Sequence, residues 1–440
     1  MSRTSARRRL AQVVAATALG AAVLVGQAAA QGAAETCQGV PATIIGSPGA
    51  TQLLGTESAD VIVSNGSRVV ASLGGDDVIC LTSSTGPRDK VTAFAGAGDD
   101  RVVNLRNGRT TTARVDLGEG NDVYVGSAGK DNVYGIDSEN VGIDRVRTGE
   151  GNDRVASGEA GQPNADDVDL GPGRDELELL AADNRAARFV GGSGSDELSA
   201  VLPRTAGSWR LDNATGAATR AGTAMIVWSS FERFALDGFA NGEQLTFVGG
   251  RSAEEVTFSA WWIDLAMGGG DDTIIARHIM SPDNPLHRSR LAGGSGRDKL
   301  QFITNDPQGL TATGDLGRGR LVAEDEGTWN DVRAEMTGIE DLAFQAPGVR
   351  LLGDGEANRL IAIGCVVRGQ GRGGPDRIVH YAACSKRGAP SQLLGGPGND
   401  RITGSALKDK LTGGAGRDVV EGLLGRDICR AEVERSCERN

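Results

Sequence analysis

Hydrophobic residues in this chain recur in short runs, and the most regular series lies near the C-terminus. Residues 395–430 divide into four consecutive nine-residue units, each beginning with glycine and each carrying an apolar residue or cysteine at its eighth position. The sixth positions hold Asp400, Asp409, Asp418 and Asp427. Residues two apart point to the same side of a strand, so each unit is predicted to be a polar turn followed by a short, half-buried strand.

The N-terminal half repeats the motif at longer intervals. The motif Gly-x-Gly-x-Asp-x-apolar occurs five times, and its aspartates are Asp100, Asp122, Asp153, Asp175 and Asp196. A variant that lacks the first glycine contains Asp77. From Asp77 to Asp196 the successive spacings are 23, 22, 31, 22 and 21 residues. The longest interval contains one additional nine-residue unit, 126–134, which carries Asp131.

This spacing predicts one coil for about every 22 residues, with two strands in each coil. We expect the five motif aspartates between Asp100 and Asp196 to stack in one column on one side of the coil. The opposite side is expected to have looser turns and fewer sites. Asp144 and Asp166 each stand close before an apolar residue and mark the second strand of a coil.

The middle of the chain is a duplication. The sequence Gly-Gly-x-Gly-x-Asp begins at Gly191, Gly293 and Gly395, and both intervals are 102 residues. Stretches without aspartate loops, such as Met225 to Trp228, are interpreted as metal-free coils. The expected organisation is a signal peptide at 1–30, an N-terminal solenoid at 31–199, two modules at 200–292 and 293–394, a regular β-roll at 395–430 and a tail at 431–440.

The chemistry of the loops favours calcium. Glycine permits positive φ and sharp turns, and aspartate supplies the hard anionic oxygen that Ca²⁺ prefers, whereas Mg²⁺ demands stricter octahedral geometry. The candidate ligands are Asp60, Asp77, Asp100, Asp122, Asp131, Asp153, Asp175, Asp196, Asp272, Asp298, Asp376, Asp400, Asp409, Asp418 and Asp427.

The nine-residue run resembles the RTX, or hemolysin-type, calcium-binding repeat, Gly-Gly-x-Gly-x-Asp-x-apolar-x. The resemblance implies an all-β parallel β-solenoid, a β-roll or β-helix built from nonapeptide and longer coils, in which Ca²⁺ lies between the turns of neighbouring coils. The chain departs from the family's toxins and proteases: it has an N-terminal signal, and no separate catalytic or pore-forming domain is recognisable.

Several positions are expected to be structural only. Asn358 and Thr51 stand at the metal position of degenerate loops. For Asp60 and Asp376 there are two alternatives: a metal-binding turn, or a turn that has kept its shape and no longer binds an ion. Glu232 and Glu340 recur with the duplication and are interpreted as hydrogen-bonding or salt-bridging groups. Three histidines, expected on the surface or in loops, are His278, His287 and His380.

The N-terminus has the features of an export signal. Four arginines precede an Ala/Val/Leu stretch, and Ala28 to Ala30 offers a small-residue cleavage site, so we expect a secreted protein without membrane insertion after cleavage. Twin-arginine export stays open beside the general secretory route. Removing residues 1–30 takes the net charge from −12 to −16, which argues against nucleic acid as a partner.

Six cysteines behind such a signal favour disulfides. Sequence proximity suggests the pairs Cys37–Cys80, Cys365–Cys384 and Cys429–Cys437.

The pattern therefore favours a non-catalytic calcium-binding protein with a structural or cell-surface role, whose further partner would be an extracellular polysaccharide or protein. Two alternatives stay open. One is a calcium-dependent polysaccharide lyase or epimerase with a β-helix fold, disfavoured by the three tyrosines and three histidines of the chain. The other is an adhesin with a defined partner.

Overall fold

The structure is a computed structural model in which every regular element is a β-strand within the described residues. Those ranges are 35–82, 90–106, 108–134, 142–158, 163–180, 184–201, 208–237, 244–260, 262–279, 289–304, 310–324, 332–383 and 390–438. In these ranges there is no helix of the length and apolar character needed to cross a bilayer.

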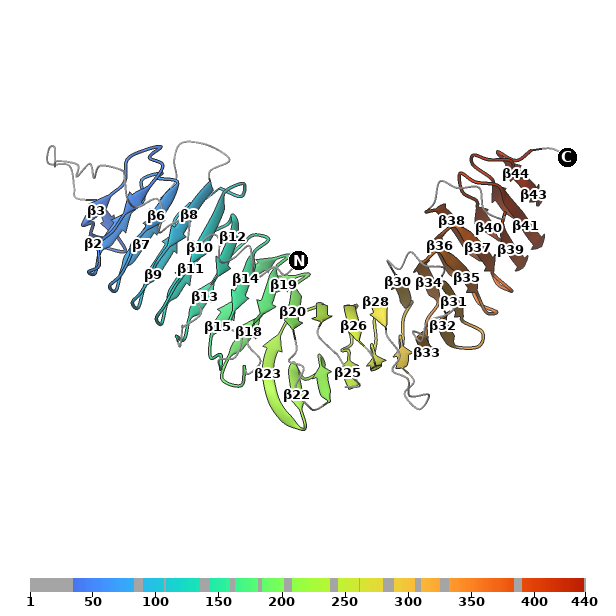
Figure 1. Ribbon diagram of the computed structural model, residues 1–440, viewed down its shortest axis with the longest axis horizontal. Coiled ribbons are helices and arrows are strands. Elements are labelled where there is room, and N and C mark those ends of the chain that lie inside the picture. The colour runs from blue at the N-terminus through green and yellow to red at the C-terminus, as the bar shows by residue number, and fades with distance from the viewer. Residues whose placement is uncertain are drawn as a thin grey trace.

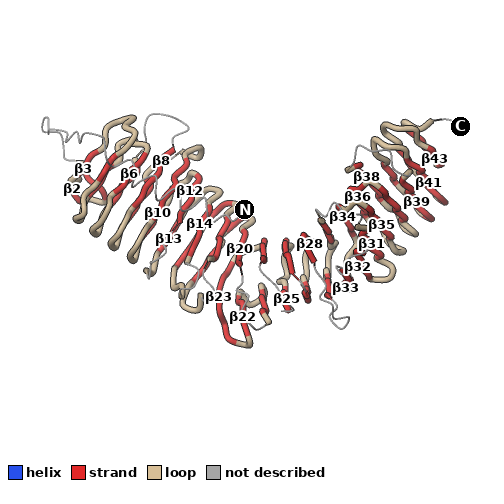
Figure 2. Tube along the Cα trace, viewed as in Figure 1, coloured by secondary structure: helices blue, strands red, loops and turns tan. Residues whose placement is uncertain are grey.

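Two long sheets run the length of the molecule, and successive strands of the chain alternate between them except at two insertions (Figures 1 and 2). Sheet 1 contains, in spatial order, β3 (Ile44–Ile45), β5 (Val61–Val63), β7 (Val78–Leu81), β9 (Arg101–Asn104), β11 (Val123–Val125), β13 (Arg145–Arg147), β15 (Asp167–Asp169), β18 (Arg188–Val190), β23 (Thr223–Ser229), β22 (Ala217–Arg220), β21 (Trp209–Asp212), β25 (Gln244–Val248), β27 (Trp262–Ala266), β29 (Ser289–Ala292), β33 (Val332–Thr337), β32 (Arg320–Glu324), β31 (Thr311–Asp315), β35 (Gly348–Leu352), β37 (Val366–Gln370), β39 (Ser391–Pro397), β41 (Asp409–Ala415) and β43 (Ile428–Arg430).

Sheet 2 contains β4 (Leu53–Leu54), β6 (Val69–Ala71), β8 (Lys90–Phe94), β10 (Thr112–Asp116), β12 (Lys130–Tyr134), β14 (Arg154–Ser157), β17 (Glu176–Leu179), β20 (Glu197–Val201), β24 (Arg233–Asp237), β26 (Glu255–Ala260), β28 (Thr273–Ile279), β30 (Lys299–Ile303), β34 (Asp341–Gln345), β36 (Arg359–Gly364), β38 (Arg377–Ala382), β40 (Arg401–Thr403), β42 (Val419–Glu421) and β44 (Val433–Arg435). Two small pairs lie outside these sheets: β1 (Thr36–Cys37) with β2 (Val40–Pro41), and β16 (Pro172–Gly173) with β19 (Ser193–Gly194).

The core is a row of apolar side chains between the two sheets. On sheet 2, Val133, Val155, Leu177 and Leu198 are in register on consecutive strands, and all four are almost completely buried. The charged residues beside them point outward because side chains alternate along a strand. A single coil cannot bury its apolar residue, so stacking closes the core. The predicted all-β parallel solenoid with two strands per coil is confirmed.

The stack is interrupted twice by antiparallel strands that belong to sheet 1 alone. On sheet 2, β24 pairs directly with β20 and β26. On sheet 1, β22 and β21 are inserted between the coil strands β23 and β25. In the second module β32 and β31 lie between β33 and β35 in the same way. Met225 to Trp228 does belong to a coil strand, β23, but the strands before it are an inserted hairpin, where the sequence predicted only coils.

These insertions account for the bend of the molecule. Each adds two strands to sheet 1 and none to sheet 2, so sheet 1 becomes longer by roughly 10 Å at each place. The longer sheet must lie on the outer side, and Figure 1 shows β22, β23, β32 and β33 on the convex side of the bend with β20, β28 and β30 on the concave side.

Aromatic side chains fill the wider core at the insertions. Phe234 packs against Trp228 and Phe247, with ring centroids 5.8 and 5.1 Å away, respectively. In the second module the centroids of Phe302 and Phe344 are 5.6 Å apart. These rings contribute to the close packing of the core beside the inserted strands.

Disulfides close both ends of the solenoid. Cys37–Cys80 joins the β1–β2 hairpin to β7 with a Cα–Cα distance of 5.6 Å, and Cys429–Cys437 closes the last coil at 5.9 Å. Both predicted pairs are confirmed. Cys365 is also disulfide-bonded, and its predicted partner Cys384 lies outside the described residues.

Deleting residues 209–220 removes β21 and β22 and lets β23 pair with β25. We expect the bend to decrease and the maximum dimension in small-angle X-ray scattering to increase. A matched deletion of 311–323 should act in the same direction. Retained β-sheet circular dichroism with an unchanged scattering profile would show that the hairpins do not cause the bend.

Candidate metal-binding columns

An acidic residue stands immediately before most coil strands, with its side chain turned inward. The backbone N–H of most such residues donates to a carboxylate oxygen of the equivalent residue in the next coil. The N–H groups of Glu232 and Glu340 donate instead to the backbone carbonyls of Asp196 and Asp298. Asp60 donates to Asp77 Oδ1 at 2.7 Å, Asp77 to Asp100 at 2.8 Å and Asp100 to Asp122 at 2.8 Å. The bonds from Asp122 to Asp144 and from Asp144 to Asp166, at 2.9 and 3.0 Å, complete this first column, which precedes strands of sheet 1.

A second column precedes the strands of sheet 2. Its members form three hydrogen-bonded runs along the same side: Asp131, Asp153, Asp175, Asp196 and Glu232; then Glu254, Asp272, Asp298 and Glu340; then Asn358, Asp376, Asp400, Asp418 and Glu432. A short third column, on the sheet 1 side near the C-terminus, links Asp409 to Asp427 at 2.9 Å and Asp427 to Glu438. All fifteen predicted aspartates therefore occupy one equivalent structural position.

The prediction that five aspartates from Asp100 to Asp196 share one column is wrong. Asp100 and Asp122 precede sheet 1, whereas Asp153, Asp175 and Asp196 precede sheet 2. The reason is the nine-residue unit 126–134, which forms β12 and adds half a coil. A half-coil moves every later glycine loop to the other side.

The prediction of looser turns on the opposite side of the coil is consequently also wrong. Asp144 and Asp166 continue the first column while the second begins, and both side chains are buried. Their spacing of 22 residues from Asp122 and from each other was the signal that could have identified them.

Glutamates replace aspartate at the insertions and at the C-terminal end. Glu232 accepts from the N–H of Asp196 at 3.0 Å, and Glu340 accepts from Asp298 at 2.7 Å. Their coils border the inserted hairpins, where one additional methylene extends the reach of the carboxylate. The expected hydrogen-bonding role of these two residues is confirmed.

Twelve aspartates keep a buried carboxylate oxygen, Oδ2, without any hydrogen-bond partner within the described residues. They are Asp77, Asp100, Asp122, Asp153, Asp175, Asp196, Asp272, Asp298, Asp376, Asp400, Asp418 and Asp427. An unpaired buried polar oxygen costs free energy, so this regular repetition requires a partner or a proton.

In all twelve turns the second residue has a positive φ. Glycine occupies this position nine times, but Leu73, Arg372 and Leu423 adopt φ of 80°, 75° and 74°. A non-glycine residue pays a free-energy cost in this region, so the turn shape is imposed by its surroundings. We call these twelve the open turns.

Three predicted ligands lie in a different turn, in which both carboxylate oxygens are hydrogen-bonded. They are Asp60, Asp131 and Asp409. The second residue of each turn is threonine or serine, and its backbone N–H donates to Oδ2. These donors are Thr56, Ser127 and Ser405, at 2.8, 3.1 and 2.6 Å respectively. We call these the closed turns; each stands at the start of a column.

A side chain from the preceding coil completes each closed turn. Thr43 donates to Asp60 Oδ1 at 3.1 Å, and Asn104 donates to Asp131 Oδ1 at 2.9 Å. His380 Nδ1 lies 3.2 Å from Asp409 Oδ1, and the residue is 1% exposed. The expected surface location of His380 is therefore wrong: its ring satisfies the carboxylate that begins the third column. The side chain of His278 and all of His287 lie outside the described residues.

Burial raises the pKa of several column carboxyl groups above their ordinary range. It raises the pKa of Asp100, Asp122 and Asp175 to about 7, and that of Asp144 and Asp153 to about 8. Backbone hydrogen bonds oppose the shift, and neighbouring carboxylates add to it. A metal-free column therefore retains protons near neutral pH.

The open turns suit a hard cation. Each would contribute Oδ2, and the remaining ligands would be backbone carbonyl oxygens of the glycine turn, an all-oxygen set that Ca²⁺ accepts. Among the described residues, no three acidic, histidine or cysteine side chains converge on one point. A bound ion would therefore need backbone carbonyl oxygens for most of its ligands, and its charge would offset that of the carboxylate.

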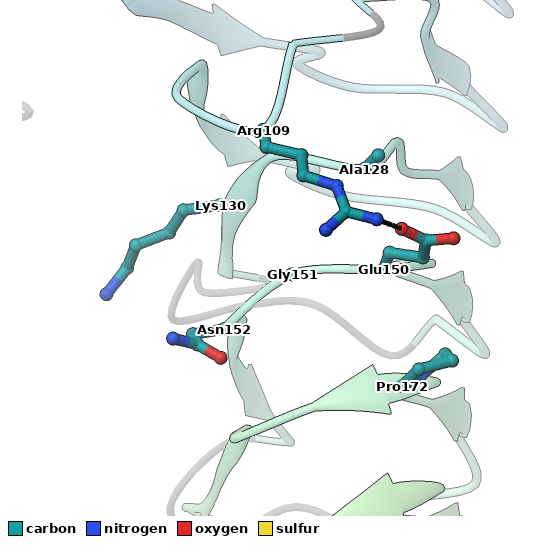
Figure 3. Close-up of a pocket in the computed structure, with 7 residues that line it drawn as sticks. All are labelled: Arg109, Ala128, Lys130, Glu150, Gly151, Asn152 and Pro172. Carbon is teal, nitrogen blue, oxygen red and sulfur yellow. Dashed lines mark hydrogen bonds and ion pairs between the residues drawn. The ribbon is translucent and has the colours of Figure 1, made fainter.

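A shallow pocket near the start of the second column offers little for catalysis. Its lining includes Arg109, Lys130, Asn152 and the single acid Glu150, whose Oε2 is 3.3 Å from the guanidinium of Arg109 (Figure 3). Both members of this ion pair are largely exposed. One solvated, paired carboxylate does not supply an acid–base pair.

Four copies of the RTX calcium-binding nonapeptide repeat match the chain, at residues 116–135 and 394–429. The chain thus carries calcium-binding repeats of the RTX family, as the nine-residue units predicted. The first match spans the turns of Asp122 and Asp131, where the second column begins. No curated protein matches the chain significantly.

Replacing Gly395 by alanine should place a Cβ 2.1 Å from Asp400 Oδ2 and displace the carboxylate. We expect the free energy of unfolding to fall by about 1–3 kcal/mol in urea titrations. Gly355→Ala is the matched control, because nothing lies within 4 Å of its Cβ position. Equal effects of both substitutions would contradict the close contact.

The metal-free protein should lose stability as pH rises from about 5 to 8. The unfolded chain releases the aspartate protons near pH 4, whereas the folded columns hold them until about pH 7 to 8, so the folded state binds more protons in this window. Urea unfolding in EGTA measures this, and Asp153→Asn should flatten the slope. Stability that increases across the same pH window would be inconsistent with buried carboxyl groups whose pKa is raised.

Proposed function

We propose that this protein is a secreted, non-catalytic calcium-binding solenoid in which Ca²⁺ stabilises the stacked coils. The supporting observation is the repetition of twelve buried Oδ2 atoms without a hydrogen-bond partner. When they are ionised, carboxylates stacked at the strand spacing of about 4.8 Å repel one another, and a divalent ion reverses the sign of that interaction.

Calcium binding would contribute directly to folding free energy, because the sites exist only when neighbouring coils are in register. The open turns of the C-terminal β-roll belong to Asp400, Asp418 and Asp427, and they are the most closely spaced along the chain. The closed turn of Asp409 lies among them, with its carboxylate already satisfied.

Export is supported by residues 1–30, which have the composition of a signal peptide, and by the disulfides at both ends, which persist in oxidising compartments. In the environment outside the cell, Ca²⁺ and disulfides would together make the solenoid durable. A structural or cell-surface role follows from this combination.

Asp418→Asn and Asp409→Asn distinguish the two turn types. In calorimetric calcium titrations of the mature chain, the change at Asp418 should reduce the number or affinity of bound ions. The change at Asp409 should lower thermal stability through its lost partners while leaving the stoichiometry unaltered.

The titration is paired with far-UV circular dichroism in EGTA and after adding Ca²⁺. Calcium uptake without any gain of thermal stability would refute the stabilising role. Absence of uptake by the unmodified chain would refute calcium binding altogether.

A further inference from the structure

The first outward-facing residue of each strand in sheet 2 forms a row along the concave side of the bend. In the N-terminal arm and the middle, arginines in this row are paired with acids. Arg154 lies 3.3 Å from Glu176 and 2.8 Å from Glu178, and Arg233 contacts the carboxylate of Glu197. Opposite charges on neighbouring strands stabilise a sheet, so this part of the row is explained by the fold itself.

The same row becomes an unbroken series of arginines in the C-terminal arm. Arg359, Arg377 and Arg401 are direct cross-strand neighbours on β36, β38 and β40. All three are exposed. Within the described part of the chain none of them makes an ion pair. Like charges placed opposite each other on adjacent strands are destabilising, so the fold does not explain this series.

Apolar and aromatic side chains lie beside the arginines on the same face. Ile361 and Ile363 follow Arg359 on β36 at alternate positions, and Tyr381 is four residues after Arg377 on β38. Tyr381 is 56% exposed, the largest such value for a tyrosine in the described residues. Tyr381 lies on the same face but four residues, roughly 13 Å, along the strand from Arg377.

The surrounding surface is basic although the protein as a whole is acidic. Residues 341–440 contain 15 lysines and arginines against 12 acids, whereas the whole chain carries a net charge of −12. Five of those acids are buried in the columns: Asp376, Asp400, Asp409, Asp418 and Asp427. The charge that a ligand meets on this arm is therefore more positive than the count alone indicates.

We infer that this face, which we call the arginine row, binds a linear polysaccharide carrying one carboxylate or sulfate on each sugar. The arginines repeat at the strand spacing of about 4.8 Å, close to the length of one sugar in an extended chain, so each strand presents one guanidinium to one anionic group. This inference does not depend on calcium occupancy of the columns.

The geometry disfavours the other polyanions. A duplex places a charge every 1.7 Å along its axis and would bring most of its phosphates against an otherwise acidic protein. A flat anionic membrane would meet the ends of the two arms before it reached the concave side of the bend. A flexible, narrow chain is the polyanion that fits the row.

The test is binding of a fluorescent chondroitin sulfate decasaccharide to the mature, calcium-loaded chain, measured by fluorescence anisotropy. A triple variant with Arg359→Gln, Arg377→Gln and Arg401→Gln should bind at least about tenfold more weakly, and the slope of log affinity against log salt should fall by about two to three. The matched control changes Arg350→Gln, Arg368→Gln and Lys410→Gln, three exposed cations on the outer face of sheet 1 in the same arm. It alters the net charge equally and should retain affinity within about twofold.

Thermal melting separates recognition from a structural role. Removing three like charges in register should leave the melting temperature unchanged or raise it by about 1–3 °C. A lower melting temperature would assign the arginines to the fold and overturn the inference. Absence of binding by the unmodified chain, or equal losses in the two triple variants, would also overturn it. Tighter binding of a charge-matched single-stranded DNA or of anionic vesicles would assign the row to that other class and reject the polysaccharide.

Discussion

The hydrogen bond from the backbone of one acidic residue to the carboxylate of the next coil is the interaction on which the solenoid depends. It fixes the register of the turns, because each carboxylate can satisfy only the N–H group directly beside it. It also turns the side chain inward, where one oxygen is occupied and the other is left free. Structural register and metal-binding capacity therefore have the same origin, a single inward carboxylate in each turn.

The two turn types show how neighbouring residues decide what that free oxygen does. Where the second residue of the turn has a positive φ, its N–H does not reach the carboxylate and the oxygen stays unpaired. Where serine or threonine stands there, as in the turn of Asp409, the backbone N–H closes the site. The closed turns lie where columns begin, so the first carboxylate of a series, which has no acidic neighbour before it, is held by protein groups alone.

Much of this was accessible from the sequence, and the limits have physical causes. The period of aspartate and apolar residues predicted the parallel coils, the buried core and the fifteen aspartates that stand in its turns. The side on which each aspartate lies was missed because the unit 126–134, which contains Asp131, adds half a coil. Each added half-coil moves the following turns to the opposite side. The inserted hairpins were missed because β21 and β22 alternate apolar and polar residues as coil strands do. Such alternation does not distinguish an antiparallel strand from a parallel one. His380 was misplaced because a buried polar partner such as Asp409 cannot be recognised before the coils are stacked.

The ends of the ladder have a consequence for the behaviour of the protein at high concentration. A stack of parallel strands invites another molecule to continue it, and an exposed terminal coil is the usual starting point of a fibre. Here the N–H groups of Asp418 and Asp427, near the ends of the second and third columns, donate to Glu432 and Glu438 of the same chain. At the other end the Cys37–Cys80 bridge holds an antiparallel hairpin against the first coils. The sequence thus terminates its own repeat in both directions, which keeps a fold capable of indefinite growth to the length of one molecule.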